Sequence, residues 1–507
     1  MSEDGRDPPV DVLTARVRST PDRTAVIDTQ TAAQWRYREL NDAVDEVAGA
    51  LCASVDEPSS RERLAVALGT TSQFVVTLHA CLRLGWELLP LNTELATPEL
   101  AARLHRSDPT ILICERATEE NVIDAVANTD LEIPVRTVDD PRTGASKSLF
   151  DRTGPVDPSP VGLDETAMIL FTSGTTGRPK GVELSRKNVL WSAIASAFRL
   201  GVTPSDRWLC CLPTYHMGGL APAIRSVLYG TTLLLQRSFE ARETASIIAE
   251  EGVTGVSLVP TQLKRLLNVG LSSRTLRTVL LGGAPASTSL LEQAAETSVP
   301  VYPTYGLTET ASQVATARPS QVEASPGTVG QPLLGTQVRI VREGDPVPPG
   351  ETGEVVVSGP TVTAGYLDEA ETAEAFGEFG LHTGDLGHLD TDGKLWVTGR
   401  RDDQIITGGE LVAPADVSAV LREIEGVKAA AVVGLDDPEW GQRVGALVVP
   451  DSAASDSEDL RGRILDQCER RLASYKQPKT VAFVDQLPRT HSGTVDRDAV
   501  RNVLTQS

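Results

Sequence analysis

Residues 167–181 read Ala-Met-Ile-Leu-Phe-Thr-Ser-Gly-Thr-Thr-Gly-Arg-Pro-Lys-Gly, an apolar run that passes directly into a loop of glycine, serine and threonine. The apolar run predicts a buried strand. Glycines let a backbone approach a phosphate closely, hydroxyls and free N–H groups donate to its oxygens, and Lys180 adds positive charge. The loop lacks the GxxxxGK[ST] spacing of a Walker A loop. It therefore predicts a phosphate-binding loop of a different kind.

Strand and helix patterns alternate on both sides of this loop. Residues 63–69 have the pattern of a buried strand, and residues 72–84 have that of a helix ended by Gly85. Such alternation is typical of parallel sheets covered by helices. The stretch 139–164 is rich in Pro, Gly, Ser and Asp, so we expect a surface loop between two lobes there. The fold class predicted for the large region is α/β, with layered parallel sheets and helices.

The pattern changes twice towards the C-terminus. From about residue 328 it consists of short strands and turns, which predicts a small β unit extending to residue 400. Residues 401–507 combine helical and strand patterns in a compact α+β arrangement. Because 507 residues exceed what one core supports, we predict a domain of residues 1–400 and a second, smaller domain of residues 401–507.

Composition excludes several classes of partner and compartment. The net charge of −22 disfavours binding to nucleic acid or to anionic membranes. No apolar run reaches the ~20 residues that span a bilayer, and the acidic N-terminus does not look like a signal peptide, so we expect a cytoplasmic protein without stable membrane insertion. The cysteines form no CxxC pair, which favours reduced thiols in the core: Cys52, Cys81, Cys114, Cys210, Cys211 and Cys468.

Three further blocks follow the phosphate loop along the chain. They are Tyr305-Gly306-Leu307-Thr308-Glu309-Thr310, then His382-Thr383-Gly384-Asp385, then residues 399–410, which read Gly-Arg-Arg-Asp-Asp-Gln-Ile-Ile-Thr-Gly-Gly-Glu. In this order and spacing they resemble the adenylate-forming superfamily of acyl-CoA synthetases, luciferases and adenylation domains. The resemblance covers nearly the whole chain. It implies a large N-terminal domain and a small mobile C-terminal domain.

The resemblance also implies the reaction and its cofactors. A carboxylate attacks the α-phosphate of ATP to give acyl-AMP and pyrophosphate, and the thiol of CoA then takes the acyl group. Lys180 and the phosphate loop wrap the β- and γ-phosphates, Thr308 donates to the α-phosphate, and Glu309 holds Mg²⁺. The residues implied to bind ATP or AMP are Thr172, Ser173, Gly174, Thr175, Thr176, Gly177, Gly283, Ala284, Tyr305, Thr308, Asp385 and Arg400.

The C-terminal part is implied to serve the second half-reaction. Asp402 matches the hinge position of the family, and Gly408 and Gly409 bring their loop against the pantetheine arm of CoA. The family's Gly-Lys pair reads Gly493-Thr494 here, so the lysine that bridges carboxylate and α-phosphate is missing. Losing such a group from a formed site costs about 2–4 kcal/mol of transition-state stabilisation. Either Arg489 or Arg497 supplies the charge, or adenylation runs slowly, or the protein does not adenylate.

The stretch from Leu212 to Gly230 is expected to bind the acid substrate. His216 matches the family block that borders the substrate carboxylate. Arg225 is a lone charge in an apolar run, and a buried charge is costly unless paired, so its partner is either a second carboxylate on the substrate or a carboxylate of the protein. Small residues in this stretch and further along the chain leave room for a ring: Gly218, Gly219, Ser257 and Gly306.

This stretch looks most like the o-succinylbenzoate–CoA ligases of menaquinone biosynthesis. That acid carries an aromatic ring and two carboxylates. The alternatives are a CoA ligase for another aryl or fatty acid, an adenylation enzyme that loads a carrier protein in trans, and a non-catalytic adenylate-binding homologue. The partners expected in the first case are a small carboxylic acid, ATP and CoA, and the sequence does not predict an oligomeric state.

Overall fold

The computed structural model describes residues 11–56, 59, 61–154, 156, 161–172, 179–407, 410–438, 440–451, 457–472, 474–490 and 495–506. These residues form two compact units. The first comprises the described residues up to 338 with 357–381 and 392–395, and the second comprises 339–356, 382–391 and 396–506. The domain boundary expected at residue 400 stays a prediction.

The first unit contains two eight-stranded sheets. One runs in the order β15 (Ala315–Thr316), β14 (Val301–Tyr305), β13 (Thr278–Leu281), β12 (Gly255–Leu258), β10 (Arg207–Cys210), β11 (Thr232–Leu235), β1 (Thr24–Asp28) and β2 (Gln34–Arg36). Its inner neighbours are parallel, while β2 and β15 pair antiparallel at the two edges. The carboxyl ends of β12, β13 and β14 therefore meet at one edge of this sheet.

The second sheet of this unit is also largely parallel. Its order is β19 (Gly365–Tyr366), β9 (Lys180–Ser185), β8 (Thr166–Thr172), β4 (Glu87–Pro90), β3 (Arg63–Ala67), β5 (Ile111–Cys114), β6 (Val135–Thr137) and β7 (Lys147–Ser148). Only β8–β9 and β9–β19 are antiparallel. The interpretation of residues 139–164 as a loop between lobes is wrong, because β7 extends this sheet and the following 3-10 turn η1 (Leu149–Asp151) buries Leu149.

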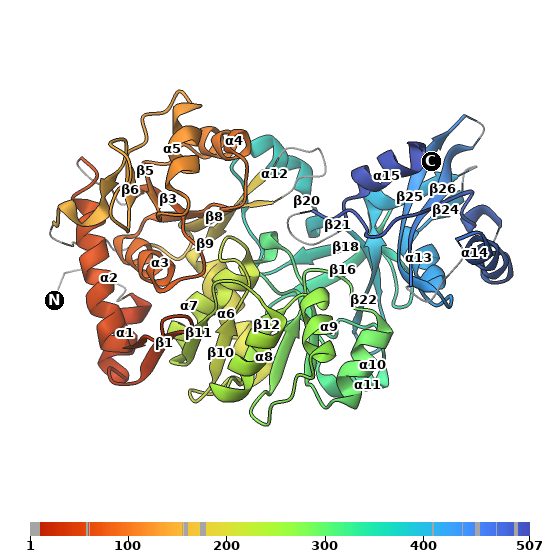
Figure 1. The fold of residues 1–507 in the computed structure, drawn as a ribbon, viewed down its shortest axis with the longest axis horizontal. Coiled ribbons are helices and arrows are strands. Elements are labelled where there is room, and N and C mark those ends of the chain that lie inside the picture. The colour runs from red at the N-terminus through yellow and green to blue at the C-terminus, as the bar shows by residue number, and fades with distance from the viewer. Residues whose placement is uncertain are drawn as a thin grey trace. The chain divides into compact units, whose positions relative to one another are not determined.

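Helices cover both sheets and fill the space between them (Figure 1). An inner layer packs against both sheets and consists of α1 (Val12–Ser19), α2 (Tyr37–Cys52), α3 (Ser72–Leu84), α6 (Arg186–Leu200) and α7 (Met217–Tyr229). One outer layer covers the first sheet with α8 (Ala241–Glu250), α9 (Pro260–Asn268) and α10 (Thr288–Glu296). The other covers the second sheet with α4 (Thr97–Ser107) and α5 (Glu119–Ala127). Shorter pieces complete the unit: η2 (Thr308–Thr310), α11 (Pro319–Ala324) and α12 (Glu369–Ala375).

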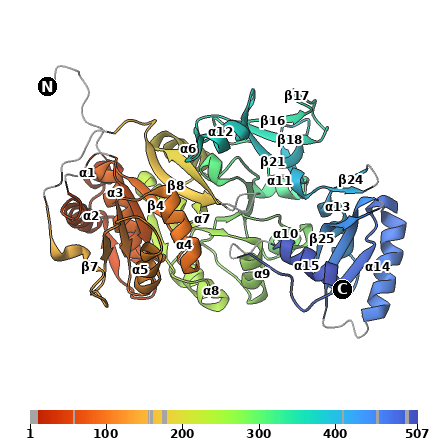
Figure 2. The ribbon, with the colours of Figure 1, turned by 90° about the horizontal axis from the view of Figure 1, so that it is seen from above.

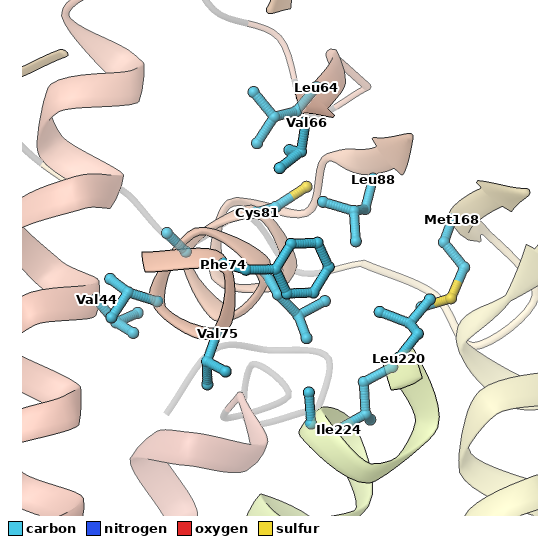
Figure 3. Packing of buried hydrophobic residues seen from close by; sticks show 14 of the residues in the cluster. Val44, Leu64, Val66, Phe74, Val75, Cys81, Leu88, Met168, Leu220 and Ile224 are labelled. Carbon is cyan, nitrogen blue, oxygen red and sulfur yellow. The ribbon is translucent and has the colours of Figure 1, made fainter. Parts of the chain in front are cut away.

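The inner core is apolar and closely packed (Figure 3). Phe74 and Val75 of α3 lie among strand residues such as Leu88 and residues of α7 such as Leu220. Helix α3 has well-defined ends, because the Thr71 hydroxyl accepts from the N–H of Phe74 at 3.3 Å and Gly85 adopts φ +81°. The core thus fixes α3 and α7 against each other.

The second unit holds most residues of two further sheets, while β20 belongs to the first unit. The strands of a six-stranded sheet run in the order β17 (Asp345–Pro346), β16 (Gln337–Arg342), β18 (Gly353–Ser358), β21 (Gly380–Leu389) and β20 (Phe376–Gly377), and β22 (Leu395–Arg400) pairs with β21. A five-stranded sheet runs β24 (Glu410–Val412), β23 (Ile405–Thr407), β26 (Gly441–Pro450) and β25 (Val427–Asp437), with β27 (Thr480–Phe483) beside β26. Two 3-10 turns occur, η3 (Arg401–Asp403) and η4 (Ser474–Lys476).

Helices cover both faces of the five-stranded sheet, as Figure 2 shows for α14 and α15. Helices α13 (Pro414–Arg422) and α14 (Ser457–Arg471) pack on the face that carries Ala430 and Val432. Helix α15 (Arg497–Gln506) packs on the opposite face, which carries Ala431 and Val433. Since side chains alternate along a strand, one apolar strand supplies both cores.

The predicted fold class is confirmed. The six cysteines are free, and five are buried. Within the described ranges no helix is long and apolar enough to cross a membrane.

Candidate functional site

The phosphate loop connects the ends of the β8–β9 hairpin. Thr172 ends β8, Lys180 begins β9, and the two residues pair directly across the antiparallel ladder. The Thr172 hydroxyl lies 3.5 Å from the Lys180 carbonyl oxygen. The intervening predicted residues lie outside the described part of the chain: Ser173, Gly174, Thr175, Thr176 and Gly177. The hairpin therefore places the two anchors of the loop opposite each other, and the phosphate contacts stay a prediction.

A tyrosine that the sequence did not single out joins Lys180 to Glu309. The Tyr366 ring lies beneath the Lys180 ammonium, 5.4 Å from Nζ to the ring centroid, and its hydroxyl donates to Oε1 of Glu309 at 3.0 Å. The N–H of Thr363 donates to the backbone carbonyl of Glu309 at 2.7 Å. Strand β19 brings Tyr366 there by pairing with β9 opposite Val182. The structure thus holds a cation and a carboxylate on the same aromatic side chain.

Thr308 and Glu309 lie on a tight turn after β14. Ala311 and Ser312 both have positive φ, +51° and +119°, which is unusual for residues other than glycine. A Cβ on Gly306 would lie 1.6 Å from the carbonyl oxygen of Ser312. Gly306 is therefore required by the turn itself, and the space on its Cβ side is filled by backbone instead of being open to a ring. Whether the residue also borders the acid stays a prediction.

Glu309 fits a hard divalent cation that is shared with a ligand. Its carboxylate is half-buried and oriented by the Tyr366 hydroxyl. Among the described residues, no three His, Cys, Asp or Glu side chains form a group that could hold a metal ion. One carboxylate with phosphate oxygens and water is the usual way in which Mg²⁺ binds beside a nucleotide. The donor set therefore fits a magnesium ion that arrives with a nucleotide.

The residues predicted to border the adenine meet at one edge of the first sheet. Gly283 (φ +77°) and Ala284 follow β13, and both are exposed. Tyr305 ends the neighbouring parallel strand β14 and is half-buried. Ser257, which was predicted to border the acid, lies in the neighbouring strand β12 and is buried. The edge formed by the carboxyl ends of parallel strands is where open α/β sheets bind ligands.

In the second unit, Asp385 and Arg400 lie side by side. Nη1 of Arg400 is 3.4 Å from Oδ1 of Asp385, and the Asp385 carboxylate is buried. Glu354, which the sequence did not single out, fixes the turn before Asp385. Its carboxylate accepts from the N–H of Gly384 at 3.0 Å and lies 3.0 Å from Nδ1 of His382. This arrangement suits a carboxylate that accepts from a pair of hydroxyls.

The predicted hinge residue Asp402 belongs to the second unit. Asp402 lies in η3, while Gly408, Gly409 and Thr494 lie outside the described residues. Arg497, one of the two arginines considered as a substitute for the missing lysine, forms an ion pair with Asp403. Burial, together with the nearby charge of Arg400, lowers the pKa of Arg497. Arg497 is therefore already engaged within its own unit.

His216 and Gly219 occupy the start of α7. His216 directly precedes the helix, and the residue is exposed. Surrounding protein atoms still exclude water from much of the imidazole and lower its pKa, which favours the neutral ring. A Cβ on Gly219 would lie 2.4 Å from the carbonyl oxygens of Leu212 and Pro213, so this glycine lets the helix pack against the preceding turn. As at Gly306, that space is not open to a ring.

Arg225 is buried in α7, and its hydrogen-bond partners among the described residues are neutral groups. Its Nη1 donates to Oε1 of Gln313 at 3.1 Å, and its Nη2 donates to the hydroxyl of Ser192 at 2.9 Å. Burial lowers its pKa, and the phenol of Tyr229 acts weakly in the opposite direction. Across the described ranges no carboxylate forms an ion pair with Arg225. The expectation of a protein carboxylate as its partner is therefore not met there.

Two models of known protein families match this chain. The family model described as AMP-binding enzyme matches residues 13–367, and the AMP-binding enzyme C-terminal domain matches residues 416–494. The chain belongs to the AMP-binding enzyme family. This AMP-binding enzyme is 38% identical over 489 residues to a 2-succinylbenzoate–CoA ligase of Bacillus licheniformis, covering 96% of this chain and 98% of that relative.

Solved structures of related AMP-binding enzymes have the same fold. The o-succinylbenzoate CoA synthetase (MenE) of Bacillus subtilis in complex with the acyl-adenylate intermediate OSB-AMP aligns with a TM-score of 0.86 at 34% identity, covering 97% of this chain and 98% of that chain. The same enzyme in complex with ATP and magnesium ion aligns with a TM-score of 0.86 at 34% identity, covering 98% of this chain and 99% of that chain.

Proposed function

We propose that this AMP-binding enzyme is an ATP-dependent acid–thiol ligase that converts 2-succinylbenzoate into 2-succinylbenzoyl-CoA, as menaquinone biosynthesis requires, in the cytoplasm. Relatives named for this activity align over nearly the whole chain, and solved relatives contain OSB-AMP or ATP with magnesium. Within this chain, the observation that carries the choice of acid is Arg225, a buried cation without a described carboxylate partner.

The reaction has two balanced halves. In the first, a carboxylate oxygen of the acid attacks the α-phosphorus of ATP, and the bond to the β-phosphate oxygen breaks, giving acyl-AMP and pyrophosphate. In the second, the sulfur of CoA attacks the acyl carbonyl carbon, the bond to the AMP oxygen breaks, and the thiol proton leaves to solvent. Both halves bring anions together, so the protein must supply donors and positive charge.

Residues of the first unit would serve the phosphates. Lys180 would meet the β- and γ-phosphates while the Tyr366 ring holds its ammonium, and Thr308 would donate to the α-phosphate. Magnesium held by Glu309 would neutralise phosphate charge when ATP is bound. In the second unit, the Asp385 carboxylate would accept from the ribose hydroxyls beside Arg400. Gly408 and Gly409 would face the pantetheine arm, with Asp402 as the hinge.

One residue just before α7 and one within it would recognise the acid. The neutral imidazole of His216 can donate one hydrogen bond to the reacting carboxylate. Arg225 would bind the aryl carboxylate, which leaves the succinyl carboxylate free to react. A guanidinium is the side chain best suited to a carboxylate in a site with little water.

A panel of acids tests this proposal. Purified protein with ATP and Mg²⁺ would be assayed for pyrophosphate release with 2-succinylbenzoate, benzoate, succinate and octanoate, each with and without CoA. We expect the fastest release with 2-succinylbenzoate and a thioester detected by mass spectrometry only when CoA is present. Faster release with benzoate or octanoate would favour a CoA ligase for another acid. Adenylation without thioester would favour an enzyme that loads a carrier protein.

One observation favours a second candidate, an adenylate-binding protein with little catalysis. Thr494 stands where the family has a lysine, and Arg497 is paired with Asp403. The variant Thr494→Lys separates the two cases, with Thr494→Val as the control for the change of side chain. We expect Thr494→Lys to raise pyrophosphate release by about tenfold or more, because a cation lowers the barrier between two anions by up to about 2–4 kcal/mol. Equal rates in all three proteins would mean that the site is already complete.

A further inference from the structure

Gln313 lies in the turn after β14 and contacts Arg225. It is 1% exposed, and its Oε1 accepts from Nη1 of Arg225 at 3.1 Å. Its Nε2 donates to the hydroxyl oxygen of Thr316 at 2.8 Å. Since an amide has one accepting and one donating end, these two contacts together fix which end faces the guanidinium.

The chain of hydrogen bonds continues beyond Thr316, and the donor in each bond can be assigned. The hydroxyls of Thr316 and Thr304 are 2.8 Å apart, and the Thr304 hydroxyl donates its single hydrogen to the carbonyl of Ala315 at 2.9 Å. The hydrogen between the two hydroxyls must therefore come from Thr316. A chain of donors runs from Gln313 through Thr316 and Thr304 to the backbone of β15, where Thr304 and Thr316 are also paired in the ladder.

The other acceptor of Arg225 is fixed in the same way. The Ser192 hydroxyl donates to the carbonyl of Ala311 at 2.6 Å, so its oxygen is left to accept from Nη2 of Arg225. Both acceptors are neutral, and they use two of the five N–H donors of the guanidinium. They orient the group without neutralising its charge.

From this geometry we propose that Gln313 is a positioning and specificity residue: its neutral amide orients Arg225 and leaves the charge for the second carboxylate of a dicarboxylic acid substrate. This rests on the proposed function and deepens it. A buried unpaired charge is costly, and a bound carboxylate removes that cost. A carboxylate in place of the amide would occupy the same volume and neutralise Arg225 permanently.

The variant Gln313→Glu tests this directly. The Thr316 hydroxyl can rotate to donate to the new carboxylate, so we expect folding to be retained, with an unfolding midpoint equal to or above that of the wild type. The KM for 2-succinylbenzoate should rise by at least 30-fold while kcat for pyrophosphate release changes less than threefold. The preference for 2-succinylbenzoate over benzoate should fall by a similar factor. Unchanged KM and preference would overturn the proposal.

Two further variants separate charge from structure. Gln236 is also 1% exposed and accepts through Oε1 from the Thr244 hydroxyl at 2.9 Å, so Gln236→Glu is a matched buried control and should leave substrate preference unchanged. Thr316→Val removes the acceptor that orients Gln313 and should raise KM by about three- to tenfold without loss of preference for the second carboxylate. Thr316→Ser should restore the wild-type KM. A Gln236→Glu variant that loses preference equally would contradict a specific role for Gln313.

The proposed function and this inference fail in distinguishable ways. If the wild type releases no pyrophosphate with 2-succinylbenzoate, the proposed function fails. Isothermal titration of wild type and Gln313→Glu with phthalate and benzoate then still measures whether a second carboxylate tightens binding. Tighter binding of phthalate by the wild type alone supports the role of Gln313, and equal binding of both acids by both proteins overturns it.

Discussion

Two arginines are buried in helices that belong to the same core, and their surroundings differ in charge. Arg83 of α3 is 4% exposed and pairs with Asp45 at 2.6 Å and with Asp11 at 3.0 Å, while Asn41 accepts a further bond at 2.8 Å. Arg225 of α7 is 8% exposed, and in the part of the chain that the structure describes it bonds only neutral oxygens.

The difference separates a charge that serves the fold from a charge that is available to a ligand. The protein neutralises Arg83 with its own carboxylates, which tie α1 and α2 to α3. A charge that is buried and oriented but not neutralised costs stability, which is a common property of binding and catalytic groups. Substituting each arginine in the same way should therefore produce opposite effects.

The largest effect is expected from Arg225→Met. Removing the charge should lower kcat/KM for 2-succinylbenzoate by about 100- to 1000-fold, because a buried charged contact to the substrate is lost. The free energy of unfolding should stay the same or increase, since a methionine of similar length needs no counter-charge. Steady-state kinetics and urea unfolding measure the two quantities. Wild-type kinetics with the dicarboxylate would eliminate Arg225 as its binding partner.

Arg83→Met should show the reverse. We expect the free energy of unfolding to fall by about 3 kcal/mol, the lower end for a broken buried pair, because the Asp45 side chain is half exposed and regains water. Activity per folded molecule should be unchanged. Urea unfolding and active-site titration test this, and a stable but inactive variant would place Arg83 in the reaction.

His79 joins the helices that carry the two arginines and allows a pH test. It is on α3, and its Nε2 hydrogen-bonds the carbonyl of Ala223 on α7 at 3.2 Å. Burial lowers its pKa to about 4; the bond to Ala223 and the charge of Asp11 oppose this, and Arg83 adds to it. The unfolded chain therefore binds the proton more readily, near its ordinary pKa of about 6.5.

The sign of the effect follows from this lowered pKa. Above about pH 6.5 the contribution is fully present, and it is lost as the pH falls towards 4. Between pH 7 and pH 5 this amounts to about 2 kcal/mol. Urea unfolding at pH 7, 6 and 5 should show a smaller loss of stability for His79→Gln, which keeps a donor, than for the wild type. Identical losses would show that His79 does not carry the pH dependence.

The smallest effect is expected from Tyr366→Phe, which changes the surroundings of the Glu309 carboxylate. Tyr366→Phe keeps the ring beneath Lys180 and removes the hydroxyl that orients the Glu309 carboxylate. We expect about tenfold weaker Mg²⁺ dependence of ATP binding, close to 1.5 kcal/mol, the lower end for one hydrogen bond to a charged group. Tyr366→Leu should in addition weaken ATP binding without Mg²⁺. Calorimetric ATP titrations at several Mg²⁺ concentrations distinguish these results, and equal behaviour of both variants would count against separate roles for ring and hydroxyl.

Much of the fold could be predicted from the sequence where the signals are local. The helix expected at residues 72–84 is α3 with the same bounds, because its cap and its final glycine are encoded next to it. The strand expected at residues 63–69 is β3 at Arg63–Ala67, since a short apolar run between turns leaves few alternatives. The strand β7 was missed because two polar residues carry no periodic pattern.

The candidate site was predictable only in part, for a related reason. A single charged residue in an apolar run is visible in the sequence alone, so Arg225 could be singled out. Its contact to Gln313 joins residues 88 positions apart, and that from Tyr366 to Glu309 joins residues 57 apart. Such contacts depend on which strands become neighbours in a sheet. A local sequence pattern does not predict that order. At Gly219 and Gly306 the small side chain serves the backbone packing of the chain itself, and their place beside the acid stays a prediction.

The register of the β8–β9 hairpin has an evolutionary consequence. Lys180 shares one face of β9 with the buried Val182 and Leu184, whereas Gly181 faces the other side, against Leu367. A one-residue insertion or deletion within β9 would exchange these faces along the strand and turn the lysine away from Tyr366. Length variation among descendants of this gene should therefore be confined to the connecting loop, and the strand itself should change only by substitution.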